Sequence, residues 1–262
     1  MFKISACGWS LTGEPMEVLR RVRGAGFDAI DLWPTGWRGI AGPEQISDAG
    51  LSLACAGVST VLSPPGTGLN ALAGADAGRV LPYFSGAIER AGALGARVVY
   101  MVTPDIRLPD DLFYGRAMAR LADSAAAAGV RLCVEPHPGR ALATSAEALD
   151  FVRRVDHENL YVLIDLGHTL ITGEDPAAAV RSAGGRLGYV HVDDNDGRDD
   201  LHLPLFSGVL TRGVAEGFLD ALANANYDGG VGIELKPTNP APLSALVAAR
   251  EFTRGWEIRR GV

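Results

Sequence analysis

The sequence predicts an α/β protein that folds as a single (β/α)8 TIM barrel over residues 1–262. Short apolar segments alternate with longer segments rich in Ala and Leu along the chain. Eight such pairs in 262 residues give about 33 residues per pair, which suits a closed barrel of eight strand–helix units. The rival fold is an open doubly wound sheet, but no GxGxxG motif follows the first apolar segment.

Eight apolar segments are expected to form the strands. Most are apolar throughout, as parallel strands buried on both faces are. In chain order they cover residues 3–9, 28–33, 51–58, 96–102, 131–136, 160–166, 187–192 and 231–235.

Helices are expected between these strands, because apolar residues recur there at helical spacing. The predicted helices cover residues 14–25, 80–94, 111–128, 145–155, 175–183, 213–225 and 242–256, with a weaker one near 43–48. Several end in a glycine directly before the next strand, as at Gly26, Gly95 and Gly129. Glycine takes the left-handed conformation that ends a helix at little cost.

Composition and charge narrow the class of protein. The net charge of −7 weighs against a nucleic-acid partner, since phosphate binding needs clustered Lys and Arg. The three cysteines are far apart in apolar runs, which favours reduced thiols in a reducing compartment. No charged-then-apolar segment of the signal type opens the sequence, and no apolar run reaches membrane-spanning length. We therefore expect a cytoplasmic protein with no membrane partner.

Four ionisable residues end the last four predicted strands: Glu135, Asp165, His191 and Glu234. Strand ends converge at one end of a barrel, so these side chains are expected to meet. Three carboxylates buried together would repel one another and raise each other's pKa, and a buried unpaired acid costs several kcal/mol. One divalent cation would resolve both problems. Oxygen-rich ligation with one imidazole favours Mn²⁺, Mg²⁺ or Co²⁺ and leaves Zn²⁺ open.

Each of these residues has an ordinary structural alternative when taken singly. A carboxylate at a strand end is often a cap or a salt-bridge partner, and a histidine on an apolar strand is often a core residue. The occurrence of all four on successive strands favours the metal site. Trp9 and Trp33 follow the first two strands and suit the apolar face of a sugar, with ordinary packing as the alternative.

Four segments carry a family resemblance: VEPHPG (134–139), IDLGH (164–168), HVDDNDG (191–197) and IELK (233–236). They resemble the xylose isomerase-like TIM-barrel superfamily, which includes sugar isomerases and epimerases, inosose dehydratase and apurinic endonucleases. The resemblance implies metal ligation by Glu135, Asp165, His191 and Glu234. It also implies that His168 binds the substrate or polarises its oxygen. His137, in the loop after a strand, either contacts substrate or braces the turn between two prolines.

The segment 193–211 is a long loop in this prediction, and long strand-to-helix loops often cover a site. Arg198 and His202 are candidate substrate contacts on it, and a solvated polar loop is the alternative. Asp200 and His202 form a D-x-H element of the kind with which apurinic endonucleases bind an additional zinc.

The resemblance implies an isomerase or epimerase of a small ketose or keto-polyol. Glu135 and Glu234 would act as base and acid beside a metal-chelated carbonyl, through an enediolate. A dehydratase of the inosose type is the first alternative, since it uses the same enolate. A zinc phosphodiesterase is a weaker one, because it needs earlier His ligands and no His precedes His137. A non-enzymatic binding module is disfavoured by the complete ligand set. The resemblance leaves a homodimer or a homotetramer open as the assembly.

Overall fold

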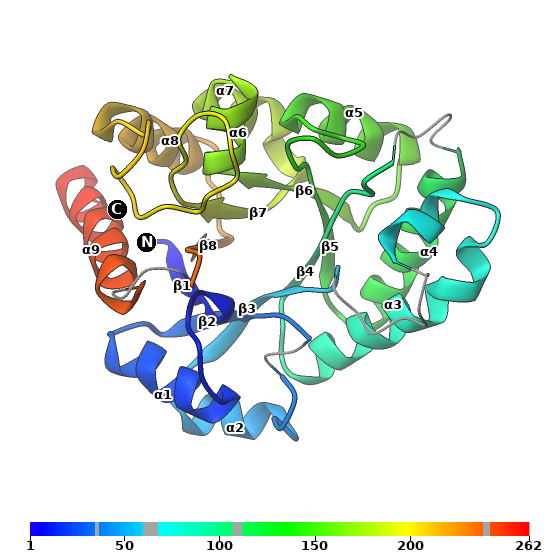
Figure 1. Ribbon diagram of the computed structural model, residues 1–262, viewed down its shortest axis with the longest axis horizontal. Helices are drawn as coiled ribbons and strands as arrows, with labels where there is room; N and C mark the ends of the chain where they lie inside the picture. The colour runs from blue at the N-terminus through cyan, green and yellow to red at the C-terminus, as the bar shows by residue number, and fades with distance from the viewer. Residues whose placement is uncertain (35–36, 60–67, 107–111, 238–241, 262) are drawn as a thin grey trace.

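The computed structural model describes residues 1–34, 37–59, 68–106, 112–237 and 242–261. Within them, eight parallel strands form a closed barrel in which each strand pairs with the next and the last pairs with the first. Figure 1 shows the strands at the centre of the molecule and the helices outside them. The predicted TIM-barrel fold is confirmed.

The strands lie close to their predicted positions. They are β1 (Lys3–Cys7), β2 (Ala29–Leu32), β3 (Ser52–Gly57), β4 (Val98–Val102), β5 (Arg131–Glu135), β6 (Leu160–Asp165), β7 (Leu187–Val192) and β8 (Gly230–Ile233). The first strand is shorter than predicted, because a 3-10 turn, η1 (Gly8–Ser10), follows it directly. The Leu11 amide closes this turn on the Gly8 carbonyl oxygen, and the turn carries Trp9 at the end of the barrel.

The α-helices are α1 (Pro15–Gly24), α2 (Pro43–Asp48), α3 (Ala77–Ala93), α4 (Leu112–Ala127), α5 (Ser145–Val155), α6 (Leu166–Thr172), α7 (Pro176–Ala183), α8 (Arg212–Asn224) and α9 (Pro242–Arg260). Two further 3-10 segments are η2 (Leu69–Ala73) and η3 (Gly184–Arg186). The predicted start of the fourth of these helices, at residue 111, lies outside the described residues. Helix α6 was not predicted and begins at once after β6.

The apolar core has two parts. The larger part lies between the strands and the surrounding helices, as parallel strands covered by helices require. A smaller cluster includes Cys55, Tyr100, Cys133, Leu163 and Tyr189, one from each of the strands β3 to β7. All three cysteines of the chain are buried free thiols. No helix among the described residues is long and apolar enough to span a membrane.

The last helix packs beside the first strand. Trp256 of α9 stacks on Phe2 with 5.6 Å between ring centroids, and its indole Nε1–H donates to Asp220 of α8. Glu257 is buried and pairs with Arg254 at 2.7 Å. Figure 1 shows the N-terminus next to α9. These contacts hold α9 against α8 and against the start of β1, the strand that closes the barrel by pairing with β8.

Candidate metal centre

The four predicted ligands meet at the C-terminal end of the barrel. Glu135 and Asp165 are the last residues of β5 and β6, His191 lies in β7, and Glu234 directly follows β8. One potential ligand atom from each lies within 4.8 Å of those of the others. All four residues are buried, with at most 6% of any of them exposed. The sequence register explains the convergence, because Asp165 pairs directly with His191 across the β6–β7 ladder.

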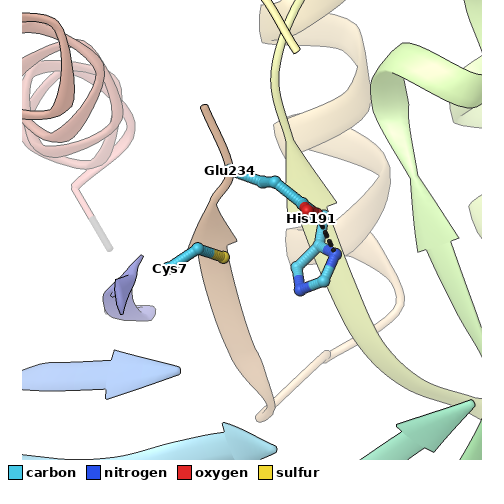
Figure 2. Close-up of side chains that lie close together, drawn as sticks. All are labelled: Cys7, His191 and Glu234. Atoms are coloured by element: carbon cyan, nitrogen blue, oxygen red, sulfur yellow. Dashed lines mark ion pairs between the residues drawn. The ribbon is translucent and has the colours of Figure 1, made fainter. Parts of the chain in front are cut away.

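His191 lies at the centre of this cluster. Its Nδ1 is 2.8 Å from Glu234 Oε2, 3.3 Å from Glu135 Oε1 and 3.9 Å from Asp165 Oδ2. Figure 2 shows the ion pair between His191 and Glu234. Burial acts to lower the pKa of His191, but the Glu234 carboxylate and its other neighbours raise it well above the usual value. Three acids thus gather around one imidazole nitrogen.

The donor set fits a divalent cation. Three carboxylates and one imidazole are ligands that Mn²⁺, Co²⁺ and Zn²⁺ all accept, and the oxygen majority also suits Mg²⁺. Among the described residues, the buried Asp165 Oδ2 has no hydrogen-bond partner. A buried carboxylate oxygen without a partner is costly, and an ion at this point would satisfy it.

Two tryptophans border the cluster on one side. The Trp9 Nε1–H donates to Glu234 Oε1 at 2.8 Å. Trp9 stacks on Trp33 with 4.8 Å between ring centroids, and the Trp33 Nε1–H donates to the Tyr100 hydroxyl at 2.9 Å. Both indoles are half-buried. They therefore form a continuous aromatic wall that reaches the cluster, and each indole nitrogen has a fixed partner.

Three histidines surround Asp200 beside the cluster. The nearest carboxylate oxygen lies 3.0 Å from His202 Nε2, 3.4 Å from His137 Nε2 and 3.6 Å from His168 Nε2. Burial acts to raise the pKa of Asp200, but the three imidazoles lower it far below its usual range. His137, His168 and Asp200 have ligand atoms close enough together to hold a cation. The structure thus brings all three predicted histidines to one place.

His168 is held in position by the backbone. Its amide donates to Asp165 Oδ1 at 2.9 Å, which makes Asp165 the N-cap of α6. Its Nδ1 lies 3.1 Å from the Pro136 carbonyl oxygen, so Nδ1–H donates there while Nε2 faces Asp200. Burial acts to lower the pKa of His168, but Asp165 and Asp200 raise it to about 10. The ring is therefore cationic near neutral pH.

The segment 193–211 contains no helix or described strand, as predicted, and a bridge between Asp194 and Leu203 folds it back on itself. His202 contacts the buried Asp193 through Nδ1 and lies 3.9 Å from Glu234 through Nε2. Arg198 is different. It is exposed, its amide bonds Asp196 within the loop, and no contact among the described residues joins its side chain to the cluster.

Asp31 of β2 is the residue near this site that the sequence analysis overlooked. It is fully buried inside the barrel, and its Oδ2 lies 3.8 Å from His191 Nε2. Burial raises the pKa of Asp31 to about 6, against the opposing effects of His191 and the Tyr189 hydroxyl. Its signal was present, since Asp31 interrupts an apolar strand as Glu135 does. It was passed over because it is not the last residue of the predicted strand.

Known proteins share this architecture and parts of this sequence. A protein-family model described as xylose isomerase-like TIM barrel matches residues 19–255. The L-ribulose 3-epimerase of Mesorhizobium japonicum is 27% identical over 243 residues, which cover 84% of this chain and 78% of that protein. An inosose dehydratase of Lacticaseibacillus casei is 24% identical over 151 residues, which cover 52% of this chain and 51% of that protein.

A solved L-ribulose 3-epimerase structure matches the fold. Its TM-score is 0.81 at 23% identity, with 99% of this chain and 96% of that chain covered. The family match extends from α1 to α9 and so includes every strand from β2 to β8. The chain therefore belongs to the xylose isomerase-like TIM-barrel family.

Proposed function

We propose that this protein is a divalent-metal-dependent epimerase or isomerase of a small ketose or keto-polyol, with Mn²⁺, Mg²⁺ or Co²⁺ as the favoured ion. One observation carries the proposal: three buried carboxylates and one imidazole gather their ligand atoms within 4.8 Å at the functional end of a TIM barrel. The similarity to an L-ribulose 3-epimerase supports the reaction type.

Four residues would bind the metal ion, and two of these would also transfer protons. Glu135, Asp165, His191 and Glu234 would hold the ion, which when bound supplies a Lewis acid that acidifies the C–H beside a carbonyl group. Glu135 and Glu234 come from strands on either side of His191 and serve as the base and acid pair. In an epimerase, one group as the carboxylate would remove the proton from the substrate carbon, and the other as the carboxylic acid would donate a proton to the opposite face.

The surrounding groups keep Glu234 in its ionised form. Burial acts to raise its pKa, but His202, His191 and the Trp9 hydrogen bond lower it below its usual range, so the carboxylate is ionised. The Trp9 Nε1–H also fixes the direction of Oε1. Such fixing matters because an acid or base must lie within hydrogen-bond reach of the carbon-bound proton.

The substrate would lie between the aromatic wall and the three histidines. Trp9 and Trp33 offer an apolar surface for the C–H face of a sugar. His168, cationic near neutral pH, can donate to a substrate oxygen. His137 and His202 are partly exposed and complete the polar side of the site.

The test begins with metal content by elemental analysis of the purified protein. We expect about one divalent ion per chain in the wild type and its loss in Glu234→Gln and His191→Asn, because each variant removes a ligand. Glu158→Gln changes an exposed carboxyl before β6, at the opposite end of the barrel, and should keep the ion. Failure of the wild type to bind Mn²⁺ or Co²⁺ on dialysis would contradict the proposal.

The metal-loaded protein is then incubated with L-ribulose and other ketoses in D₂O. We expect deuterium at the carbon beside the carbonyl and a new stereoisomer of unchanged skeleton. A dehydratase is the second candidate, supported by the similarity to inosose dehydratase. Mass spectrometry separates the two, because dehydration removes one water from an inosose substrate and epimerisation removes nothing.

A further inference from the structure

We propose that Asp31 is a positioning residue that orients the His191 imidazole, so that Nε2 carries its proton and Nδ1 faces the carboxylate cluster. The inference rests on the proposed function, because His191 is one of the four proposed ligands. It gives a role to a fifth buried residue, Asp31. This residue lies on β2, a strand that supplies none of the four proposed ligands.

The Asp31 carboxylate is fixed from one side. Its Oδ1 accepts a hydrogen bond from the Cys55 amide at 3.1 Å. The Tyr189 hydroxyl lies 2.9 Å from Oδ1 and 3.0 Å from Oδ2, and the Ser5 hydroxyl is 2.7 Å from that of Tyr189. The β2–β3 register shifts between Ile30 and Asp31, beside the same Cys55 amide. Such a shift changes the direction of the side chains next to it. Here it occurs at Asp31, whose carboxylate points into the barrel.

The other oxygen faces His191. Asp31 Oδ2 is 3.8 Å from Nε2, and among the described residues this buried Nε2 has no hydrogen-bond partner. A neutral imidazole has one N–H and one lone pair. A carboxylate on the Nε2 side stabilises the proton there. Nδ1, which pairs with Glu234 at 2.8 Å, is then the nitrogen whose lone pair would be offered to an ion that takes the place of its proton.

The neighbouring strand β8 leaves room for this arrangement. Gly232 of β8 pairs with His191 across the ladder. A Cβ atom at Gly232 would lie 2.4 Å from Asp31 Oδ2 and 2.8 Å from His191 Cδ2, so any side chain there would force the two apart. The close approach of carboxylate and ring is thus built from three strands, β2, β7 and β8.

Cys7 is the competing neighbour of the imidazole. Figure 2 shows its sulfur directed toward the His191 ring, and Cys7, His191 and Glu234 have potential ligand atoms close together. Cys7 is fully buried. Its Sγ lies 3.7 Å from Asp31 Oδ2 as a donor. A protonated thiol is a weak acceptor, which leaves Asp31 as the group that orients the ring.

The deciding experiment compares Asp31→Asn, Cys7→Ala and the wild type. Co²⁺ affinity is measured by titration against a competing chelator, and the visible absorption spectrum of bound Co²⁺ reports the ligands around the ion. We expect Asp31→Asn to bind Co²⁺ about 10- to 100-fold more weakly, with a shifted visible band. Cys7→Ala should stay within about twofold of the wild type, as expected for a residue that neither ligates the ion nor orients a ligand.

Two outcomes overturn the positioning role. One is wild-type affinity in Asp31→Asn. The other is weaker binding with an unshifted spectrum, since that reflects a lost negative charge alone. If Asp31→Asn does not fold by circular dichroism, Tyr189→Phe replaces it, and it should show a smaller loss of affinity with a shift of the band. A Tyr189→Phe variant identical to the wild type then overturns the inference. A wild type that binds no Co²⁺ overturns the proposed function as well, so the two failures are distinguishable.

Discussion

The glycine at position 167 allows buried polar side chains to pack beside the candidate site. Gly167, in the first turn of α6, has no room for a methyl group: a Cβ atom there would lie 1.7 Å from Asp193 Oδ1 and 2.4 Å from Asn195 Nδ2. Asp193 and Asn195 are both fully buried. Asp193 in turn contacts His202. A glycine at this position therefore lets the loop after β7 pack against α6 beside the candidate site.

Gly167→Ala should lower the free energy of unfolding by about 1–3 kcal/mol, because the added methyl group must displace buried polar side chains. Urea unfolding followed by circular dichroism measures the change. Gly213→Ala is the matched control, since nothing lies within 4 Å of a Cβ atom at that helical position. We expect the control to be unchanged or up to about 1 kcal/mol more stable. Equal effects in the two variants would argue against the packing explanation.

Single residues also mark the limits of sequence reasoning. Glu135 and Glu234 could be found because each ends an apolar run, and the register of a barrel brings strand ends together. Asp31 carries the same signal one position before the end of β2, and no pattern indicates that its carboxylate faces His191. Arg198 was predicted from its loop alone. Contacts such as the Asp194–Leu203 bridge determine which side chains of a loop point toward the site, and the sequence does not reveal them.

At the scale of elements, the junction between β6 and α6 combines two roles in one residue. Asp165 ends the strand and caps the helix, so its Oδ1 accepts the His168 amide while its Oδ2 faces the cluster. Because α6 follows β6 without a loop, no separate turn segment marks its start in the sequence. For this reason α6 was not predicted. The helices with clear apolar spacing, such as α3 and α5, were predicted closely.

Helix α5 begins with a reciprocal cap that contributes to stability. The Thr144 hydroxyl accepts from the Glu147 amide at 3.1 Å, and Glu147 Oε2 accepts from the Thr144 amide at 3.0 Å. Thr144→Ala should lower the free energy of unfolding by about 1 kcal/mol, because the Glu147 amide at the helix start loses its fixed partner. Thr144→Ser keeps the hydroxyl and should stay close to the wild type in the same urea titration. A large loss in the Ser variant would point to the methyl group instead.

At the scale of the whole molecule, the barrel was predictable because its signal is repeated eight times. Each strand pairs with its sequence neighbour, so an error in one element, such as the shortened β1, leaves the order of the others intact. The site is less redundant. Its second half, the group of histidines around Asp200, depends on how the 193–211 loop folds over the barrel, and sequence spacing alone does not determine that path.

Ion binding should stabilise the whole fold, because the four ligands come together in the closed barrel. At a free ion concentration of 100 Kd, the gain is about 2.7 kcal/mol. For a chain of this size we expect a rise of about 2–4 °C in Tm for each kcal/mol. Thermal unfolding with and without Co²⁺ measures the rise, and Glu234→Gln should respond much less. An equal rise in that variant would indicate that the ion binds elsewhere.

The pairing of β8 with β1 has a consequence for synthesis on the ribosome. Strand β1 emerges first and remains an open edge until its last neighbour has been made. All four proposed ligands lie in the later half of the chain, and Glu234 emerges after the other three. An ion therefore cannot help the early strands to fold. All four ligands can hold it only after β8 and Glu234 have been translated. Metal uptake would then separate finished molecules from incomplete translation products.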